Sequence, residues 1–251
     1  MRFLSRFRSK TPCFSASLQP DAPFYAVGDV HGRIDKLHVL LDLLKTQAHP
    51  TASLILVGYY LDPGNPTAQV LQVLHQMQTN SAPGTMTCLR GNHEAMLLAF
   101  LDRPERNGAR WLRYGGLQTL ASYNLRLPPG PAESTDWADI RDRLRAAIGP
   151  EIEAWLRALP LDWQSGNVYV CHAGADPDLP VTLQSEQTLL WGHPEFDTRP
   201  RTDGIWVVHG HTIVDAPCSN EGRISIDTGA YATGKLTAAL IEEGSVQFLT
   251  T

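Results

Sequence analysis

Short unbroken apolar runs alternate with longer segments of helical spacing over the first hundred residues of the chain. The unbroken runs have the length of buried strands, and each leads into glycine or polar residues: residues 24–30, 53–57 and 85–89. The segments that follow them space their apolar residues as amphipathic helices do: residues 33–47, 66–77 and 95–101. This alternation predicts a β-sheet with helices packed on it.

The middle of the chain differs, because residues 104–160 show helical spacing interrupted by a Pro-rich loop at residues 128–131. We expect this block to form a helical insertion or cap. Runs of strand length return after it: residues 168–171, 204–208, 223–226, 236–241 and 246–249. No stretch resembles a linker, so the pattern predicts one α/β (α+β) domain over residues 23–251. The first twenty residues hold four basic and no acidic side chains, and residues 1–22 are expected to form a loosely packed tail.

Composition limits the classes of partner. The chain has 251 residues, 43% of them apolar and 19% charged, with a net charge of −5. These values are ordinary for a soluble protein and give no overall attraction to nucleic acid or to an anionic membrane. We therefore expect a cytoplasmic protein that binds neither. Its four cysteines lack a C-x-x-C pair, which argues against a zinc ribbon or a disulfide framework.

Potential metal ligands follow several of the predicted strands. Asp29 and His31 are two residues apart after the first run, so on an extended strand end their side chains point the same way. Asn92, His172 and His211 each follow a later run, nearly always beside glycine. A single histidine at a strand end is more often merely hydrogen-bonded than bound to metal. Five such groups together indicate a site for manganese, iron or zinc.

The motifs around these residues resemble those of the calcineurin-like metallophosphoesterases. The matching stretches are G-D-V-H-G at residues 28–32, L-R-G-N-H-E at 89–94, H-A-G at 172–174 and H-G-H-T at 209–212. Bacterial serine/threonine phosphatases and symmetrical diadenosine tetraphosphatases belong to this branch. The resemblance implies a four-layer αββα sandwich of two central mixed sheets flanked by helices.

The resemblance also implies a role for each residue in a two-metal site. Asp29 and His31 would hold the first ion, and Asn92, His172 and His211 the second. His93 would protonate the leaving oxygen, and Asp62 would orient the side chain of His93. Asn92 would also contact the substrate. A metal-activated hydroxide would then hydrolyse a phosphomonoester of a protein or of a nucleotide.

The chain departs from the family pattern at three positions. Tyr59 replaces the carboxylate that bridges the two ions, Pro63 replaces a phosphate-binding arginine, and His193 takes the place of a second arginine. A neutral phenol provides no bridge unless an iron ion ionises it, so we expect one well-held ion, most simply manganese, rather than two. The group around Asn92 is expected to bind more strongly than Asp29 and His31.

Two functions remain open at this point. The chain is either a strongly weakened metal-dependent phosphoesterase or a non-catalytic pseudophosphatase that binds a metal, a phosphate or a protein partner. Retention of Asp29, His31, Asn92, His93, His172 and His211 favours the enzyme. The combined loss of the metal-bridging carboxylate and of the phosphate-binding arginines favours the non-catalytic binding protein.

Overall fold

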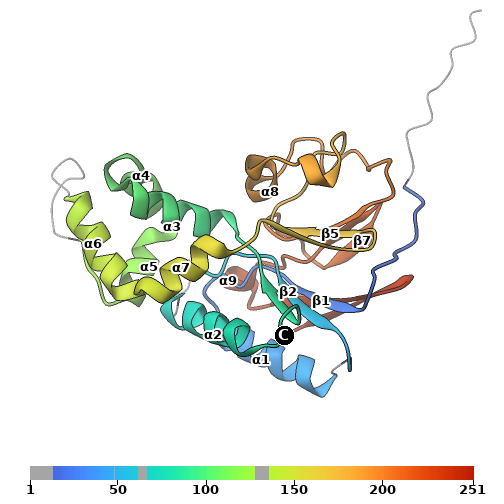
Figure 1. Ribbon diagram of the computed structural model, residues 1–251, viewed down its shortest axis with the longest axis horizontal. Coiled ribbons are helices and arrows are strands. Elements are labelled where there is room, and N and C mark those ends of the chain that lie inside the picture. Colours follow the sequence, from blue (N-terminus) through green and yellow to red (C-terminus); the bar gives the residue numbers. More distant parts are fainter. Residues whose placement is uncertain (1–13, 48, 62–66, 128–135) are drawn as a thin grey trace, which may run out of the picture.

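Two five-stranded sheets lie in the centre of the molecule, with helices outside them (Figure 1). The computed structural model describes residues 14–47, 49–61, 67–127 and 136–251. The first sheet has the order β10–β9–β1–β2–β3, formed by β1 (Phe24–Val27), β2 (Ser53–Leu56), β3 (Met86–Cys88), β9 (Thr237–Glu242) and β10 (Ser245–Thr250). The second has the order β4–β5–β6–β8–β7, formed by β4 (Asp162–Ser165), β5 (Val168–Cys171), β6 (Trp206–His209), β7 (Cys218–Asn220) and β8 (Arg223–Ser225). Both sheets are mixed.

Side-chain alternation along the central strands builds the layers. On β1, Phe24 and Ala26 point into a core shared by the two sheets, while Tyr25 and Val27 point toward helices on the outer face. Those helices are α1 (Ile34–Thr46) and α2 (Thr67–Asn80). On β5 the same alternation directs two side chains into the shared core and two toward α8 (Glu186–Trp191). The expected αββα sandwich is confirmed, and the double burial explains why these strands read as unbroken apolar runs.

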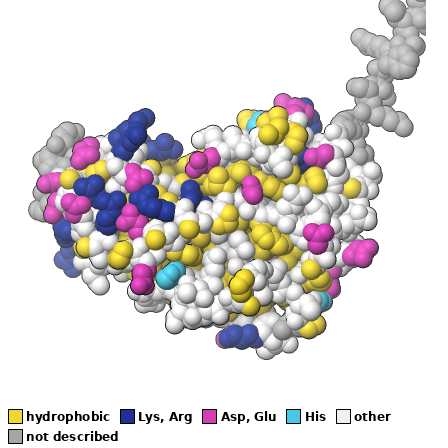
Figure 2. Space-filling model, in the orientation of Figure 1, with side chains coloured by type: hydrophobic (Ala, Val, Ile, Leu, Met, Phe, Trp, Pro, Cys, Tyr) yellow, Lys and Arg dark blue, Asp and Glu magenta, His cyan; other side chains and the backbone are white. Residues whose placement is uncertain are grey.

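A lobe of helices lies beside the sandwich (Figure 1). It contains α3 (Asn92–Asp102), α4 (Pro104–Trp111), a π-helical turn (Leu112–Gly116), α5 (Leu117–Ser122), α6 (Trp137–Ile148) and α7 (Pro150–Ala158). Trp111 stacks on Phe100 inside the lobe, with 4.3 Å between ring centroids. Charged side chains gather over its surface (Figure 2), and some are paired, as in the 2.6 Å contact of Arg157 with Asp102. Two short helices complete the described part of the chain: η3 (Val181–Leu183) and α9 (Ala230–Thr233).

The sequence pattern missed the strands β4 and β7 and the helix α8. β4 and β7 are edge strands with polar, largely exposed residues, so neither shows an apolar run. The six-residue helix α8 is too short to display a period. Among the described residues, no helix has both the length and the apolar content needed to cross a bilayer.

Residues 14–22 do not form the loosely packed tail that was expected for this part of the chain. Leu18 is buried in the core between the sheets, and Phe14 packs edge-on against Trp206 at 5.0 Å. Gln19 donates its backbone N–H to Asn167 Oδ1 at 2.7 Å. The expectation rested on basic residues near the start of the chain, which lie outside the described residues, whereas apolar side chains at 14 and 18 dock this segment.

Candidate functional site

Asp29 lies at the centre of the site, in the loop after β1. Its side chain is buried, with 1% exposure, and both carboxylate oxygens accept from the backbone N–H of His211, at 3.3 and 3.2 Å. This contact requires glycine at position 210, because a Cβ there would lie 1.9 Å from Asp29 Oδ1. The H-G-H segment thus approaches Asp29 through its backbone.

His31 reaches the same site by a left-handed turn rather than by strand alternation. β1 ends at Val27, and His31 has a φ of 54°, a conformation that non-glycine residues seldom adopt. Its backbone N–H donates to Tyr59 O at 2.7 Å, which holds the turn in place. Burial lowers the pKa of His31 to about 3, so its imidazole is neutral and available as a ligand.

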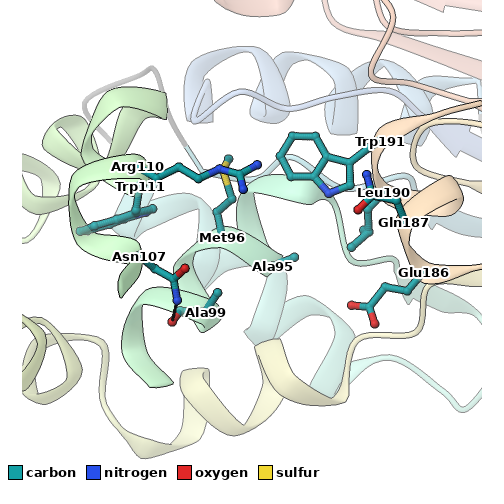
Figure 3. Close-up of a pocket in the computed structure, with 10 residues that line it drawn as sticks. All are labelled: Ala95, Met96, Ala99, Asn107, Arg110, Trp111, Glu186, Gln187, Leu190 and Trp191. Carbon is teal, nitrogen blue, oxygen red and sulfur yellow. Dashed lines mark hydrogen bonds between the residues drawn. The ribbon is translucent and has the colours of Figure 1, made fainter. Parts of the chain in front are cut away.

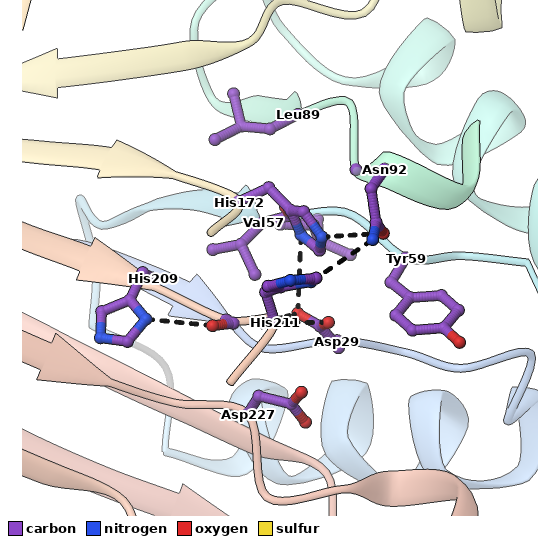
Figure 4. Close-up of polar contacts among 12 residues, drawn as sticks. Asp29, Val57, Tyr59, Leu89, Asn92, His172, His209, His211 and Asp227 are labelled. Atoms are coloured by element: carbon purple, nitrogen blue, oxygen red, sulfur yellow. Dashed lines mark hydrogen bonds and ion pairs between the residues drawn. The ribbon is translucent and has the colours of Figure 1, made fainter. Parts of the chain in front are cut away.

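Asn92, His172 and His211 form a second group on the other side of Asp29 (Figure 4). His172 Nε2 lies 3.1 Å from Asn92 Oδ1, and Asn92 Nδ2 lies 3.4 Å from His211 Nδ1. His172 Nδ1 is 3.1 Å from Val57 O, a group that only accepts, so Nδ1 carries the proton and Nε2 presents a lone pair. Burial lowers the pKa of both histidines, which keeps them neutral.

This second group has the donor chemistry of a metal site. With His172 neutral, its Nε2 lone pair faces the amide oxygen of Asn92. Two acceptors that face each other repel. A cation bound between them removes this repulsion, and so does a flip of the Asn92 amide that exchanges its oxygen and nitrogen. Asn92 lies in the first turn of α3, which begins three residues earlier than the predicted helix. The Glu94 carboxylate accepts from the Gly91 N–H at 2.8 Å and thereby caps the start of α3.

Asp227 is a site residue that the sequence analysis did not identify. It lies beneath Asp29, opposite the Asn92 group (Figure 4), and its carboxylate, the Asp29 carboxylate and the His31 ring offer ligand atoms within 4.8 Å of one another. Burial raises the pKa of Asp227 to about 6, and burial together with Asp227 raises that of Asp29 well above its usual value. The signal that could have revealed it is the one used elsewhere: an acidic residue at the end of an apolar run, two residues before glycine.

Tyr59 lies at the side of the site, next to Asp29 and the Asn92 group (Figure 4). Its ring stacks on His93 at 3.7 Å and lies 4.2 Å from the ring of His31. Figure 4 shows its hydroxyl pointing away from Asp29 and from the Asn92 group. The backbone is again left-handed, with a φ of 54°, and its N–H donates to the buried carboxylate of Glu94 at 3.0 Å.

The remaining predicted residues are placed to differing degrees. His93 lies in the first turn of α3 with 8% exposure. His193 lines a groove with His211, and its Nε2 is 3.7 Å from Asp176 Oδ2. Asp62 and Pro63 lie outside the described residues. The structure therefore brings Asp29, His31, Asn92, His172 and His211 together, while the catalytic and substrate-binding roles stay predictions.

A cleft of about 460 Å³ adjoins the site between the helical lobe and α8 (Figure 3). The Arg110 guanidinium lies over the ring of Trp191, 5.5 Å from its centroid. The same tryptophan is 6.3 Å from the ring of His211. Trp191 thus forms the boundary between the cleft and the Asn92 group.

Comparisons with known proteins agree with this geometry. The chain is 27% identical over 235 residues to a bis(5'-nucleosyl)-tetraphosphatase PrpE, named asymmetrical, from Oceanobacillus iheyensis, which covers 84% of this chain and 86% of the relative. A relative of the same name from Halalkalibacterium halodurans is 24% identical over 243 residues, covering 88% and 90%. Both names specify the asymmetrical type, whereas the motifs had suggested the symmetrical one.

Solved structures share the fold. A candidate diadenosine tetraphosphatase has a TM-score of 0.61 at 20% identity, covering 94% of this chain and 98% of the other. The cold-active protein-tyrosine phosphatase of a Shewanella species has a TM-score of 0.57 at 18% identity, covering 93% and 83%. The family profile of calcineurin-like phosphoesterases matches residues 22–219, most of the chain. The chain therefore belongs to the calcineurin-like phosphoesterase family.

Proposed function

We propose that the protein is a metal-dependent phosphoesterase that hydrolyses phosphoester and phosphoanhydride bonds of nucleotides, with turnover well below that of an intact family member. The convergence of Asp29, Asn92, His172 and His211 within one cluster, buried except at His211, supports this proposal most directly. The family implies a divalent ion, and the mixed oxygen and nitrogen donors suit manganese, with iron or zinc as alternatives.

Each side chain has a defined part in this proposal. A bound divalent ion would polarise the phosphoryl group and lower the pKa of water. The Val57 carbonyl fixes the tautomer of His172, as an outer-shell partner of a metal ligand does. His93, at the edge of the cluster, would donate a proton to the leaving-group oxygen.

Two substitutions account for the expected loss of rate. Tyr59 supplies a ring and no charge where a carboxylate bridge is expected. Pro63 supplies no guanidinium, and removal of one preorganised donor from a reaction site typically lowers the rate by about 10²–10³. The two losses need not add, because both groups serve one reaction centre.

Nucleotides are favoured as substrates by the cleft next to the site. An indole face at Trp191 and a guanidinium at Arg110 offer stacking and charge to a base and a phosphate. Both curated relatives carry the name of a dinucleoside-tetraphosphate hydrolase. Turnover of a bis(5'-nucleosyl) tetraphosphate with manganese should exceed that of a phosphoserine peptide. The reverse ranking would indicate that phosphoproteins are the substrates. The cytoplasmic location stays a prediction.

One observation favours the second function, a non-catalytic binding protein. The ring of Tyr59 covers His93, the residue expected to act as the acid. Hydrolysis of p-nitrophenyl phosphate with manganese separates the two functions. Activity that His93→Ala abolishes and His38→Ala, at an exposed position on α1, leaves intact would support the enzyme. Absence of turnover in the unmodified protein, with manganese bound, would support the pseudophosphatase.

A further inference from the structure

We infer that Asp227 completes a three-ligand site for a divalent cation with Asp29 and His31, and that this site holds the more tightly bound ion. Asp227 thereby provides the second carboxylate that Tyr59 does not supply. The inference rests on the metal dependence in the proposed function and goes beyond it by naming the ligands of the stronger site.

The backbone holds Asp227 against Asp29 by a close approach at glycine. A Cβ at Gly28 would lie 2.2 Å from Ile226 O, so only glycine lets the end of β1 touch the segment before Asp227. The Asp227 carbonyl accepts from Val214 N at 2.9 Å, and its Oδ1 accepts from Gly229 N at 2.8 Å. These bonds position the carboxylate before any ion arrives, which lowers the cost of ordering it on binding.

The other carboxylate oxygen of Asp227 points to a missing ligand. Asp227 has 1% exposure, and no N–H or hydroxyl group of the described residues donates to its buried Oδ2. The Asp29 carboxylate lies close enough to interact with the Asp227 carboxylate, and without a cation these two acceptors can share only a proton. A buried oxygen without a donor is unfavourable, and more so when the group is charged. A carboxylate oxygen of Asp227 lies within 4.8 Å of ligand atoms of Asp29 and His31, so one cation can bind all three side chains.

Charge distinguishes this site from the Asn92 group. Two carboxylates and a neutral imidazole balance a divalent cation, whereas Asn92, His172 and His211 bring no negative charge of their own. A buried cation is stable only when it is compensated. This reverses the expectation from sequence, in which the Asn92 group was the stronger of the two.

Calorimetric titration of metal-free protein with Mn²⁺ tests the inference. Asp227→Asn keeps the size of the side chain and the Oδ1 contact but removes the charge. Loss of an outer-shell partner alone weakens metal binding by about 10–100-fold, so loss of a ligand should weaken the tight site at least about tenfold. Asp215→Asn makes the same change at an exposed position and should bind as the unmodified protein does. Asn92→Ala should retain the tight ion.

The outcomes separate the inference from the proposed function. Unchanged affinity in Asp227→Asn, or loss of the tight ion in Asn92→Ala, would overturn the inference even if the protein hydrolyses phosphate esters. Tight binding that depends on Asp227 without hydrolysis would support the inference and contradict the proposed function. Should Asp227→Asn fail to fold, crystals of unmodified protein soaked in Mn²⁺ decide: anomalous density between Asp29 and Asp227 supports the site, and density only at Asn92 overturns it.

Discussion

The ring of Tyr59 stacks on the imidazole of His93, with 3.7 Å between centroids and 14° between planes. Tyr59 lies in the loop after β2 and His93 in the first turn of α3, and the phenol lies where the family pattern places a carboxylate. The stack explains how the chain accommodates the exchange: the ring gains aromatic contacts with His93 and His31 instead of coordinating an ion. The backbone at Tyr59 is strained, because its φ lies in the left-handed region.

Restoring the family residues should therefore raise activity. We expect Tyr59→Asp combined with Pro63→Arg to increase kcat/KM for p-nitrophenyl phosphate by about 10²-fold or more, because the pair returns a bridging carboxylate and a phosphate clamp. Calorimetry should detect a second manganese ion in the same variant.

Tyr59→Phe is the matched control for that pair of changes. It keeps the stacked ring and removes only the hydroxyl, so activity and metal content should match those of the unmodified protein. A loss of metal in Tyr59→Phe would show that the phenol is a ligand, contrary to the orientation in Figure 4.

Glu94 should be important for stability. Its buried carboxylate accepts from Tyr60 N and Gly91 N at 2.8 Å each and from Tyr59 N at 3.0 Å, which ties the loop after β2 to the start of α3. Glu94→Gln turns an amide N–H₂ toward backbone donors, and we expect the free energy of unfolding to fall by about 2 kcal/mol. Urea denaturation measures this change.

The control for Glu94→Gln is Glu105→Gln, the same change at an exposed position of α4. It should alter the free energy of unfolding by no more than about 0.5 kcal/mol. Equal stabilities for the two variants would mean that the Glu94 carboxylate does not hold the loop.

The cleft beside Trp191 should determine substrate preference. Arg110→Ala removes the guanidinium that lies 5.5 Å from the Trp191 centroid, and we expect a several-fold higher KM for a dinucleoside tetraphosphate. The kinetics of p-nitrophenyl phosphate should not change, because that substrate is too small to fill both cleft and site. Arg113→Ala, another exposed arginine of the lobe, should leave both substrates unaffected.

The cysteines should differ sharply in reactivity. Burial raises the pKa of Cys88 and of Cys171 to about 12, so only about one thiol in 10⁴ is ionised at pH 8, and neither side chain is accessible. Cys218 is exposed on β7 and should react with a thiol reagent within minutes. In a Cys13→Ser background, native protein should show one fast thiol, and protein in urea should show three. Rapid labelling of Cys88 without denaturant would contradict the packing described for β3.

The pattern of apolar and polar residues along the chain predicted much of the fold. β1, β5 and β9 are buried on both faces, so their apolar character is continuous and can be recognised without knowledge of the neighbouring strands. Edge strands β4 and β7 bury little, and their identity depends on the strand beside each of them. The sequence of an edge strand does not show which strand it pairs with.

The candidate site divides in the same way. Asp29, His31, Asn92, His172 and His211 could be named from the chain alone, because each is a potential ligand at the end of an apolar run, and all but His172 are next to glycine. Their grouping follows from the packing of the two sheets, which brings the ends of β1 and β3 close to the ends of β5 and β6. Asp227 carried the same local signal, yet its part in the site depends on how closely two backbones approach at Gly28. The stacking of Tyr59 on His93 likewise depends on a left-handed turn and on Glu94, 35 residues away. Local residue chemistry thus marks which side chains are able to bind an ion, whereas contacts between distant segments decide which of them share one.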